Sequence, residues 1–193
     1  MKYLVDTNVF LHTIDSNIYG VAKKCSDLNN NVCITQTIMD ELTPGYYIVK
    51  SDASTAEIEI CVRNCTKNGV FKVIELIDIS EIDGAKIILK SIRDRFYSWM
   101  YNFDYLQLLL QRGEITQKEI SSKCFKNKDL GECELLSIAK ASHGEYVIIT
   151  NDRGHVYCHP YQNIFEAYEE DNDVVIYSGN KWIKDIIKFI DEI

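Results

Sequence analysis

The chain opens with a hydrophobic run that leads into an acid and two small polar residues, Tyr3-Leu4-Val5-Asp6-Thr7-Asn8-Val9-Phe10-Leu11. This pattern predicts a short buried strand with Asp6 at its carboxyl end and a helix that starts directly after it. Ligand sites in parallel α/β sheets form outside the carboxyl ends of the strands, so a carboxylate there could hold a cation. Capping of the following helix by Asp6 or Asn8 explains the same residues equally well.

Length and composition indicate one domain with a substantial core. The chain has 193 residues, of which 46% are hydrophobic and only two are proline, and we expect a single domain over residues 1–193. Seven cysteines at irregular spacing favour reduced thiols over a disulfide framework. The sequence lacks both the hydrophobic length of a membrane span and the pattern of a signal peptide. We therefore expect a cytoplasmic protein without membrane association.

The charge balance narrows the classes of function. A net charge of −8 argues against a passive nucleic-acid-binding protein, because contacts to phosphate need clustered Lys and Arg. It is compatible with an enzyme whose acids hold divalent cations, since the metal restores positive charge locally. Lys123, Lys126 and Lys128 form one small basic cluster. A solvated loop is the favoured interpretation of this cluster, and guidance of RNA is the alternative.

Strand and helix patterns alternate along the chain, as is typical of an α/β fold. Besides the first strand, hydrophobic runs predict strands over 32–35, 70–79, 146–150 and 173–177. Helical patterns lie between them, over 9–30, from Thr35 or Thr37 to about 42, over 53–68 and over 129–141, and a last helix follows the final strand.

The most periodic segment of the chain lies in its middle, where apolar residues alternate at spacings of four and three: Ala85, Leu89, Ile92, Phe96, Trp99, Phe103, Leu106 and Leu110. This seam predicts one long helix ending at Gly113, followed by a more polar helix over 115–125. We interpret about 80–127 as a helical insertion whose seam packs on the core. A dimer or partner surface, or a clamp over a substrate groove, is the alternative.

Four acids fall at strand ends or near helix ends: Asp6, Glu41, Glu134 and Asp152. The strand over 146–150 repeats the opening pattern and runs into Asp152, so Asp6 and Asp152 would lie close together if their strands are neighbours. Four clustered carboxylates would repel one another and raise their own pKa values unless hard divalent cations bind them. For Glu41 taken alone, an exposed acid at a helix end is the plain alternative.

Four short blocks, taken together and in this order, resemble the motifs of PIN-domain nucleases: Val5-Asp6-Thr7-Asn8, Ile34-Thr35-Gln36-Thr37-Ile38-Met39-Asp40-Glu41-Leu42, Leu130-Gly131-Glu132-Cys133-Glu134-Leu135-Leu136-Ser137-Ile138-Ala139 and Ile149-Thr150-Asn151-Asp152. The matching segments cover 1–45 and about 128–192. The resemblance implies a three-layer α/β/α domain with a central parallel sheet. It also implies a ribonuclease that hydrolyses phosphodiesters with water activated by Mg²⁺ or Mn²⁺.

The resemblance also implies roles for particular residues. The catalytic metal ligands are Asp6, Glu41, Glu134 and Asp152, and the polar side chains that orient them are Asn8 and Thr150. Members of the family include many toxins of bacterial toxin–antitoxin pairs. The expected partners are therefore an RNA substrate and an antitoxin-like protein inhibitor, with a second copy of the chain as a further candidate.

The third block departs from the commonest toxin form. Glu134 stands where those toxins usually have Asp, and Glu132 is a competing ligand, although it is also placed to form a capping box with Asp129. We expect Glu134 to be the ligand. Arg153 would contact either a phosphate or a surface acid. The favoured function is an endoribonuclease, and the alternative is a non-catalytic PIN-like module that binds RNA or a protein.

Overall fold

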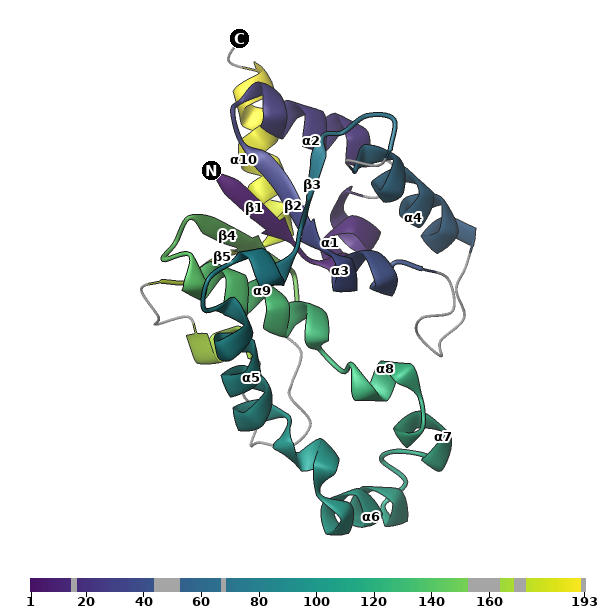
Figure 1. The fold of residues 1–193 in the computed structure, drawn as a ribbon. Coiled ribbons are helices and arrows are strands. Elements are labelled where there is room, and N and C mark those ends of the chain that lie inside the picture. The colour runs from purple at the N-terminus through teal and green to yellow at the C-terminus, as the bar shows by residue number, and fades with distance from the viewer. Residues whose placement is uncertain (15–16, 44–52, 67–68, 153–163, 169–172, 192–193) are drawn as a thin grey trace.

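A five-stranded parallel sheet forms the centre of the computed structural model, which describes residues 1–14, 17–43, 53–66, 69–152, 164–168 and 173–191 (Figure 1). The strands lie in the order β3-β2-β1-β4-β5, and every neighbouring pair is parallel. Their bounds are β1 (Lys2–Val5), β2 (Asn31–Thr35), β3 (Ile74–Ile77), β4 (Tyr146–Ile149) and β5 (Val175–Tyr177). The predicted α/β class with a central parallel sheet is confirmed.

Helices cover both faces of this sheet. On one face lie α2 (Ile18–Asp27), α4 (Ala53–Cys65) and α10 (Gly179–Asp191), and on the other lies α9 (Leu130–Ala141), with α5 (Ala85–Phe96) packed against its outer side (Figure 1). This is the three-layer α/β/α arrangement that the PIN-like resemblance implied. The part of the chain that the structure describes contains no helix long and apolar enough to cross a membrane.

The central strands are buried because helices cover both of their faces. All four residues of β4 are buried, and so are the last four of β2, which is typical of parallel strands. Ile148 of β4 and Leu136 of α9 are both fully buried, so α9 covers its face of the sheet. Polar groups are therefore left mainly to the strand ends, where the chain turns into helices.

The described residues of the first helical segment do not form the single helix predicted over 9–30. They include α1 (Thr7–Val9), the π-helix η1 (Phe10–Ile14) and α2. Single π-turns inside helical segments are rare and occur often at functional sites. After β2, the side chain of Thr35 caps α3 (Gln36–Glu41) by accepting a hydrogen bond from the Ile38 amide, so this helix begins where the sequence predicted.

The predicted single long helix along the apolar seam is wrong. The chain forms α5, the 3-10 turn η4 (Ser98–Tyr101) and α6 (Phe103–Gln111). Tyr97 leaves the helical conformation with a φ of −126°, and Asn102 starts α6 by accepting a hydrogen bond from the Tyr105 amide. A break between two apolar residues of a regular seam cannot be read from the spacing alone. The helix does end near Gly113, which has a φ of 69°.

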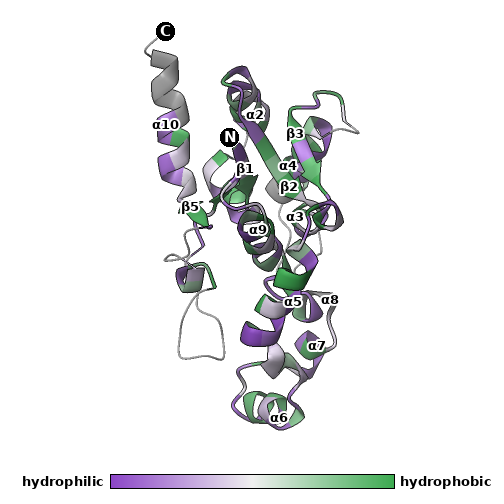
Figure 2. Cartoon of the chain, turned by 60° about the vertical axis from the view of Figure 1, so that its left-hand side comes forward, coloured by the Kyte–Doolittle hydropathy of each residue, from purple (hydrophilic) through white to green (hydrophobic). Residues whose placement is uncertain are grey.

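Beyond α5 the chain forms an arm, defined here as residues 98–128, which projects away from the sheet (Figures 1 and 2). The predicted helix over 115–125 is two shorter ones, α7 (Gln117–Ile120) and α8 (Lys123–Lys126). The arm has a small core of its own, in which the Trp99 ring packs edge-on against Tyr105 and Phe125, with centroids 6.1 and 5.9 Å away. Two further 3-10 turns, η3 (Ile79–Glu81) and η5 (Glu166–Tyr168), complete the described elements.

Candidate active site

Hydrogen bonds hold the carboxylate of Asp6 in a fixed orientation. It lies at the carboxyl end of β1 and is only 2% exposed. One oxygen, Oδ1, accepts a hydrogen bond from the Thr7 amide at 2.7 Å. The other, Oδ2, accepts from Thr150 Oγ1 at 2.6 Å and from Asn8 Nδ2 at 2.7 Å. Asp6 therefore caps α1 and also holds its carboxylate in one orientation. The two interpretations of the opening sequence, a helix cap and a carboxylate placed to hold a cation, are therefore compatible.

The pairing of β1 with β4 brings the second strand end to this carboxylate. Val5 lies opposite Ile149, and the Asp6 amide donates to the Ile149 carbonyl at 3.0 Å. Thr150 follows directly, and its Oγ1 also accepts from the Asp152 amide at 2.9 Å. The Asp152 carboxylate lies near enough to Asp6 to repel it. The two acids expected to meet at neighbouring strand ends are thus brought together.

Asn8 connects the same two strand ends. Besides contacting Asp6, its Nδ2 lies 3.3 Å from Thr150 Oγ1, and its Oδ1 accepts from the Asn151 amide at 3.1 Å. The Asn151 side chain in turn donates to Thr13 Oγ1 of η1 at 2.6 Å. The two residues predicted as supports, Asn8 and Thr150, therefore contact Asp6 directly.

Glu41 reaches the site from the end of α3. It is 5% exposed, and its Oε2 accepts a hydrogen bond from Thr7 Oγ1 at 2.5 Å. Gly131 of α9 lies against it, because a Cβ at that position would be 2.9 Å from Glu41 Oε1 and 2.8 Å from Ile38 Cδ1. Sequence reasoning missed Thr7 and Gly131. The only sequence signal for either is its position as a small residue next to a candidate acid, since Thr7 follows Asp6 and Gly131 precedes Glu132.

The structure places Glu132, rather than Glu134, among these acids. Glu132 is partly buried in the first turn of α9, and its pKa is raised well above the usual range by burial and then by repulsion from Asp6, Asp129 and Glu41. Residues two apart on an α-helix point about 200° apart, so both glutamates cannot face the same acid.

Glu134 faces a different part of the sheet edge. Its Oε1 accepts from Thr37 Oγ1 at 2.9 Å. It lines an open pocket of about 320 Å³ together with Thr35, Asp78 and neighbouring residues. The structure therefore groups Asp6, Glu41, Glu132 and Asp152 and leaves Glu134 outside that group. Arg153, also named from the sequence, lies outside the described residues.

Burial dominates the electrostatics of the group. It raises the pKa of Asp6 to about 6, against the opposing effect of hydrogen bonds from Thr150 and Thr7, and repulsion from Asp152 adds to the rise. The carboxylate pair Asp6 and Glu132 is therefore costly to ionise fully without a counter-charge.

The donor set suits a hard cation, although the side chains do not yet converge on one. All four acids offer oxygen, the ligand that Mg²⁺ and Mn²⁺ prefer, and a divalent ion would offset the repulsion that raises the pKa values of Asp6 and Glu132. Among the described residues, no three His, Cys, Asp or Glu side chains lie close enough to hold one ion as they stand.

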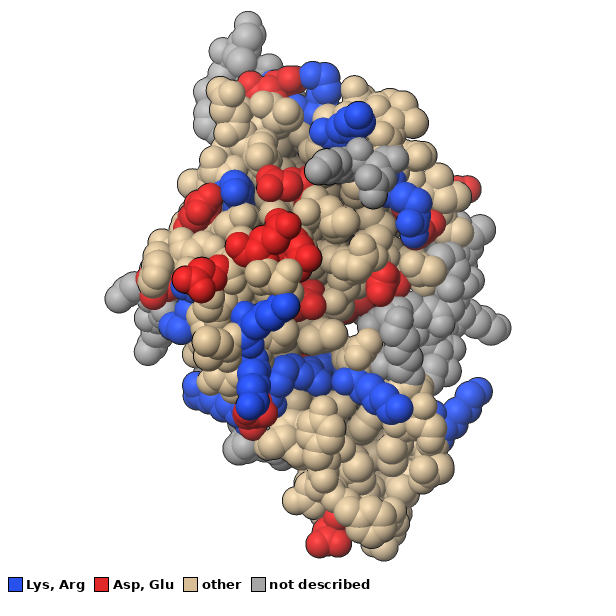
Figure 3. Space-filling model, in the orientation of Figure 1, with Lys and Arg blue, Asp and Glu red and all other residues tan. Residues whose placement is uncertain are grey.

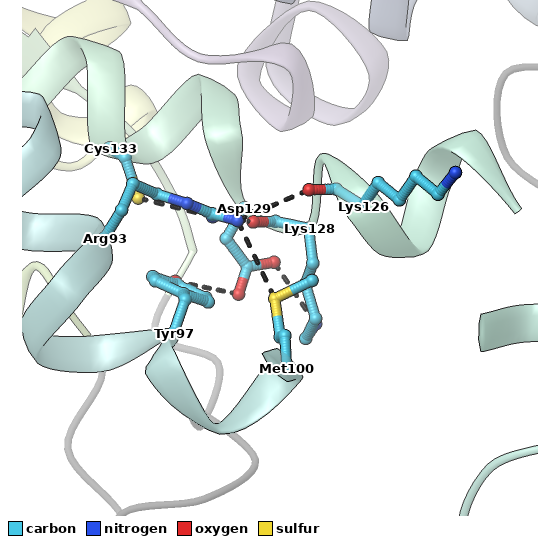
Figure 4. A network of polar contacts seen from close by, with 7 residues as sticks. All are labelled: Arg93, Tyr97, Met100, Lys126, Lys128, Asp129 and Cys133. Atoms are coloured by element: carbon cyan, nitrogen blue, oxygen red, sulfur yellow. Dashed lines mark hydrogen bonds and ion pairs between the residues drawn. The ribbon is translucent and has the colours of Figure 1, made fainter. Parts of the chain in front are cut away.

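A polar network joins α5 to the start of α9 (Figure 4). The Arg93 guanidinium donates to the carbonyl oxygen of Lys128 and, at 3.4 Å, to that of Lys126, and it lies 4.2 Å from the centroid of the Tyr97 ring. The Tyr97 hydroxyl donates to Asp129 Oδ2 at 2.9 Å, and the Lys128 ammonium lies 3.2 Å from Asp129 Oδ1. We call these five residues the α9 latch.

The latch explains why the predicted capping box is wrong. Asp129 has a φ of 50° and makes no side-chain capping hydrogen bond to α9, because Tyr97 and Lys128 occupy its carboxylate. Glu132 is therefore not engaged in a reciprocal cap with Asp129, and repulsion from Asp6, Asp129 and Glu41 contributes to its raised pKa.

Comparisons with known proteins were made in sequence and in structure. No family model matches the chain, and no curated protein matches it in sequence. Among solved structures, the chain is similar to VapBC2 from Rickettsia felis, crystallised bound to a DNA fragment from its promoter, with 16% sequence identity and a TM-score of 0.47. The likeness covers 92% of this chain and 98% of the other. It is too weak to support an assignment of function.

Replacement of the latch arginine is expected to destabilise the protein. Arg93→Met keeps the aliphatic contacts but leaves two backbone carbonyls without their charged donor, and it should lower the free energy of unfolding by about 1–3 kcal/mol. Arg95→Met on the same helix, where the side chain is exposed, should change it by less than about 0.5 kcal/mol. Urea unfolding of both variants measures the difference. Equal effects would show that the latch does not stabilise the start of α9.

The raised pKa of Asp6 predicts a pH dependence of stability in the metal-free protein. The folded state holds the proton more tightly than the unfolded chain, so the contribution of Asp6 is present below pH 4 and is lost as pH rises through about 6. Relative to Asp6→Asn, which cannot ionise, the wild type should lose roughly 3 kcal/mol of unfolding free energy across that window. Urea unfolding in EDTA from pH 4 to 7.5 tests this, and a constant difference between the two proteins would contradict it.

Proposed function

We propose that this chain is a metal-dependent endoribonuclease that hydrolyses RNA phosphodiesters. The observation that carries the proposal is the grouping of Asp6, Glu41, Glu132 and Asp152 at the carboxyl end of β1, with Asp6 buried and its pKa raised. Buried acids without charge compensation destabilise a fold, so their accumulation at one sheet edge favours a role in holding cations. Such sites need no nucleophilic side chain, because water activated by the metal attacks the phosphodiester.

We propose Glu132 as the third-block ligand in place of Glu134. Repulsion from Asp6 and Glu41 raises the pKa of Glu132, which supports its proximity to them, whereas Glu134 is hydrogen-bonded to Thr37. Mg²⁺ or Mn²⁺ held by Asp6, Glu132 and Asp152, with Glu41 beside them, would supply Lewis acidity toward a phosphodiester and lower the pKa of an attacking water.

The chain's own side chains would keep the site organised for that chemistry. Thr150 and Asn8 hold Asp6 in one orientation, and Thr7 holds Glu41. Outer hydrogen bonds of this kind fix the direction of ligating carboxylates, and their loss typically costs 10–100-fold, an order-of-magnitude figure, in affinity or activity. Gly131 lets α9 approach Glu41 closely enough to complete the group.

One observation favours a second candidate, a non-catalytic PIN-like module that binds RNA or a protein. As they stand, no three of the described acids converge on a single point. A module of that kind would bind its partner equally well with and without divalent ions. The toxin role, the antitoxin-like inhibitor and the homodimer stay predictions from the sequence.

Cleavage of RNA tests the function and the choice of ligand in one experiment. With Mn²⁺ or Mg²⁺ the wild type should cut single-stranded RNA, and EDTA should abolish the cutting. Asp6→Asn and Glu132→Gln should each lower the rate by at least about 100-fold, whereas Glu134→Gln, two residues away on the same helix, should stay within about tenfold of the wild type.

The paired glutamate variants separate two kinds of failure. If Glu134→Gln loses activity and Glu132→Gln keeps it, the nuclease assignment holds and our choice of ligand is wrong. If the folded wild type leaves RNA intact with either metal, and RNA binding is unchanged by EDTA, the non-catalytic module is the function.

A further inference from the structure

Charge is distributed very unevenly along the chain. Residues 85–128, which form α5 and the arm, contain nine Lys or Arg and four Asp or Glu, a net charge of +5. The remaining 149 residues contain twelve Lys or Arg and twenty-five Asp or Glu, a net charge of −13. A basic segment within an acidic protein is the electrostatic footprint expected of a surface that meets phosphates.

Basic side chains gather on one face where α5 and α8 approach each other. Figure 3 shows a band of Lys and Arg crossing the molecule there, between a group of acids above it and the arm below it. Exposed lysines in this region are Lys86 and Lys90, one turn apart on α5, and Lys126 at the end of α8. We call these three lysines the basic band. In the described part of the chain, neither Lys90 nor Lys126 forms an ion pair through its ammonium group.

Two large aromatic side chains are exposed in the arm, at the end of η4 and the start of α6. Tyr101 is 83% exposed and Phe103 is 72% exposed. Both lie where the apolar seam breaks, at the Asn102 cap, so the break takes Phe103 out of the packed seam and exposes it to solvent. Because Phe103 is exposed, the protein lacks the hydrophobic stabilisation that burying this ring along a continuous helix would have given. Departures from a locally consistent pattern are expected mainly at functional sites.

The aromatic pair is carried on a packed support. Trp99 and Tyr105, which flank the pair in sequence, pack against each other, and Phe125 packs on Trp99. Asn102 Oδ1 accepts from the Tyr105 amide at 3.0 Å and fixes the turn between η4 and α6. The exposed rings therefore project from a defined part of the arm.

The elements that carry the basic band contact α9, the helix that bears Glu132, or the residues just before it. α5 packs along α9, and Arg93 donates to the carbonyl oxygens of Lys126 in α8 and of Lys128, four residues before Glu132. From Lys86 to Phe96 the helix rises about 15 Å. At about 3.4 Å per nucleotide along a stacked strand, this length corresponds to roughly four nucleotides.

We propose that the basic band and the exposed pair Tyr101 and Phe103 form a docking surface for single-stranded nucleic acid, RNA under the proposed nuclease function. The lysines would contact the phosphates, and the two rings would stack on unpaired bases. A basic track combined with exposed aromatic rings is how proteins bind single strands with little sequence preference. Bases in a duplex are already stacked and offer no free faces to the rings, so the surface suits single strands.

Binding measured in EDTA tests the surface without cleavage. The probes are a fluorescently labelled oligouridine of about 16 nucleotides, the matching oligodeoxythymidine and a duplex RNA of equal length. The variants are Lys90→Gln/Lys126→Gln and Tyr101→Ser/Phe103→Ser. The matched control for charge is Lys181→Gln/Lys184→Gln on α10, which removes two exposed lysines from another face.

The wild type should bind oligouridine more tightly than the duplex. The variant Lys90→Gln/Lys126→Gln should weaken binding and reduce the slope of log K against log salt by about 1.4, which is about 0.7 for each phosphate contact to a single strand. Tyr101→Ser/Phe103→Ser should weaken binding by about tenfold or more with an unchanged salt slope. The control Lys181→Gln/Lys184→Gln should bind like the wild type.

Several results would overturn the proposal. These are equal weakening by the control, wild-type binding by both surface variants, or tighter binding of the duplex. Equal or tighter binding of oligodeoxythymidine would reject RNA as the preferred strand. Loss of self-association in Tyr101→Ser/Phe103→Ser without loss of RNA binding would assign the rings to a contact between copies of the chain.

The outcome is independent of the test of catalysis. Tight binding in EDTA without metal-dependent cutting supports the docking surface and rejects the nuclease. Cutting that persists unchanged in both surface variants, with unchanged binding, supports the nuclease and rejects the docking surface.

Discussion

The burial of one carboxylate at the end of β1 is the constraint on which the candidate site depends. Asp6 is nearly inaccessible to solvent, and its three hydrogen-bond donors come from its own helix turn and from the end of β4. Those donors can meet only because β1 and β4 pair in parallel with Val5 opposite Ile149. A shift of one residue in this register would turn Thr150 to the opposite face of the sheet. The sheet topology and the site are therefore one arrangement.

The positions of Glu41 and Glu132 in the candidate site depend on helix packing rather than on strand pairing. α9 comes close to Glu41 because Gly131 has no side chain to prevent it. The rotation of α9 about its axis brings Glu134 to Thr37 and leaves Glu132 near enough to Asp6 and Glu41 for their repulsion to raise its pKa. Tyr97 and Lys128 contact the Asp129 carboxylate, which makes no capping hydrogen bond to α9. These polar contacts join the end of α5 to the residue that precedes α9, the helix that carries Glu132.

The arm combines features that stability alone does not require. It has its own aromatic core around Trp99, and yet it exposes Tyr101 and Phe103. It also carries positive charge on an otherwise acidic chain. A helix that only covered the core would bury its apolar seam throughout. The combination of an anionic site and a cationic surface on adjoining elements is what a protein acting on a polyanion needs, because the acids alone would repel phosphate.

The sequence by itself determined the order of the elements, the α/β class and the placement of Asp6 and Asp152 after two buried strands. Those features are encoded locally, by hydrophobic runs and by the residues that end them. Only the tertiary structure shows that Glu134 is hydrogen-bonded to Thr37, that Thr7 and Gly131 are neighbours of Glu41, and that the seam breaks at Asn102. The direction of a helical side chain depends on how the whole helix is rotated by its neighbours, and contacts such as Tyr97 with Asp129 join residues that are 32 positions apart. Such contacts leave no periodic trace in the sequence.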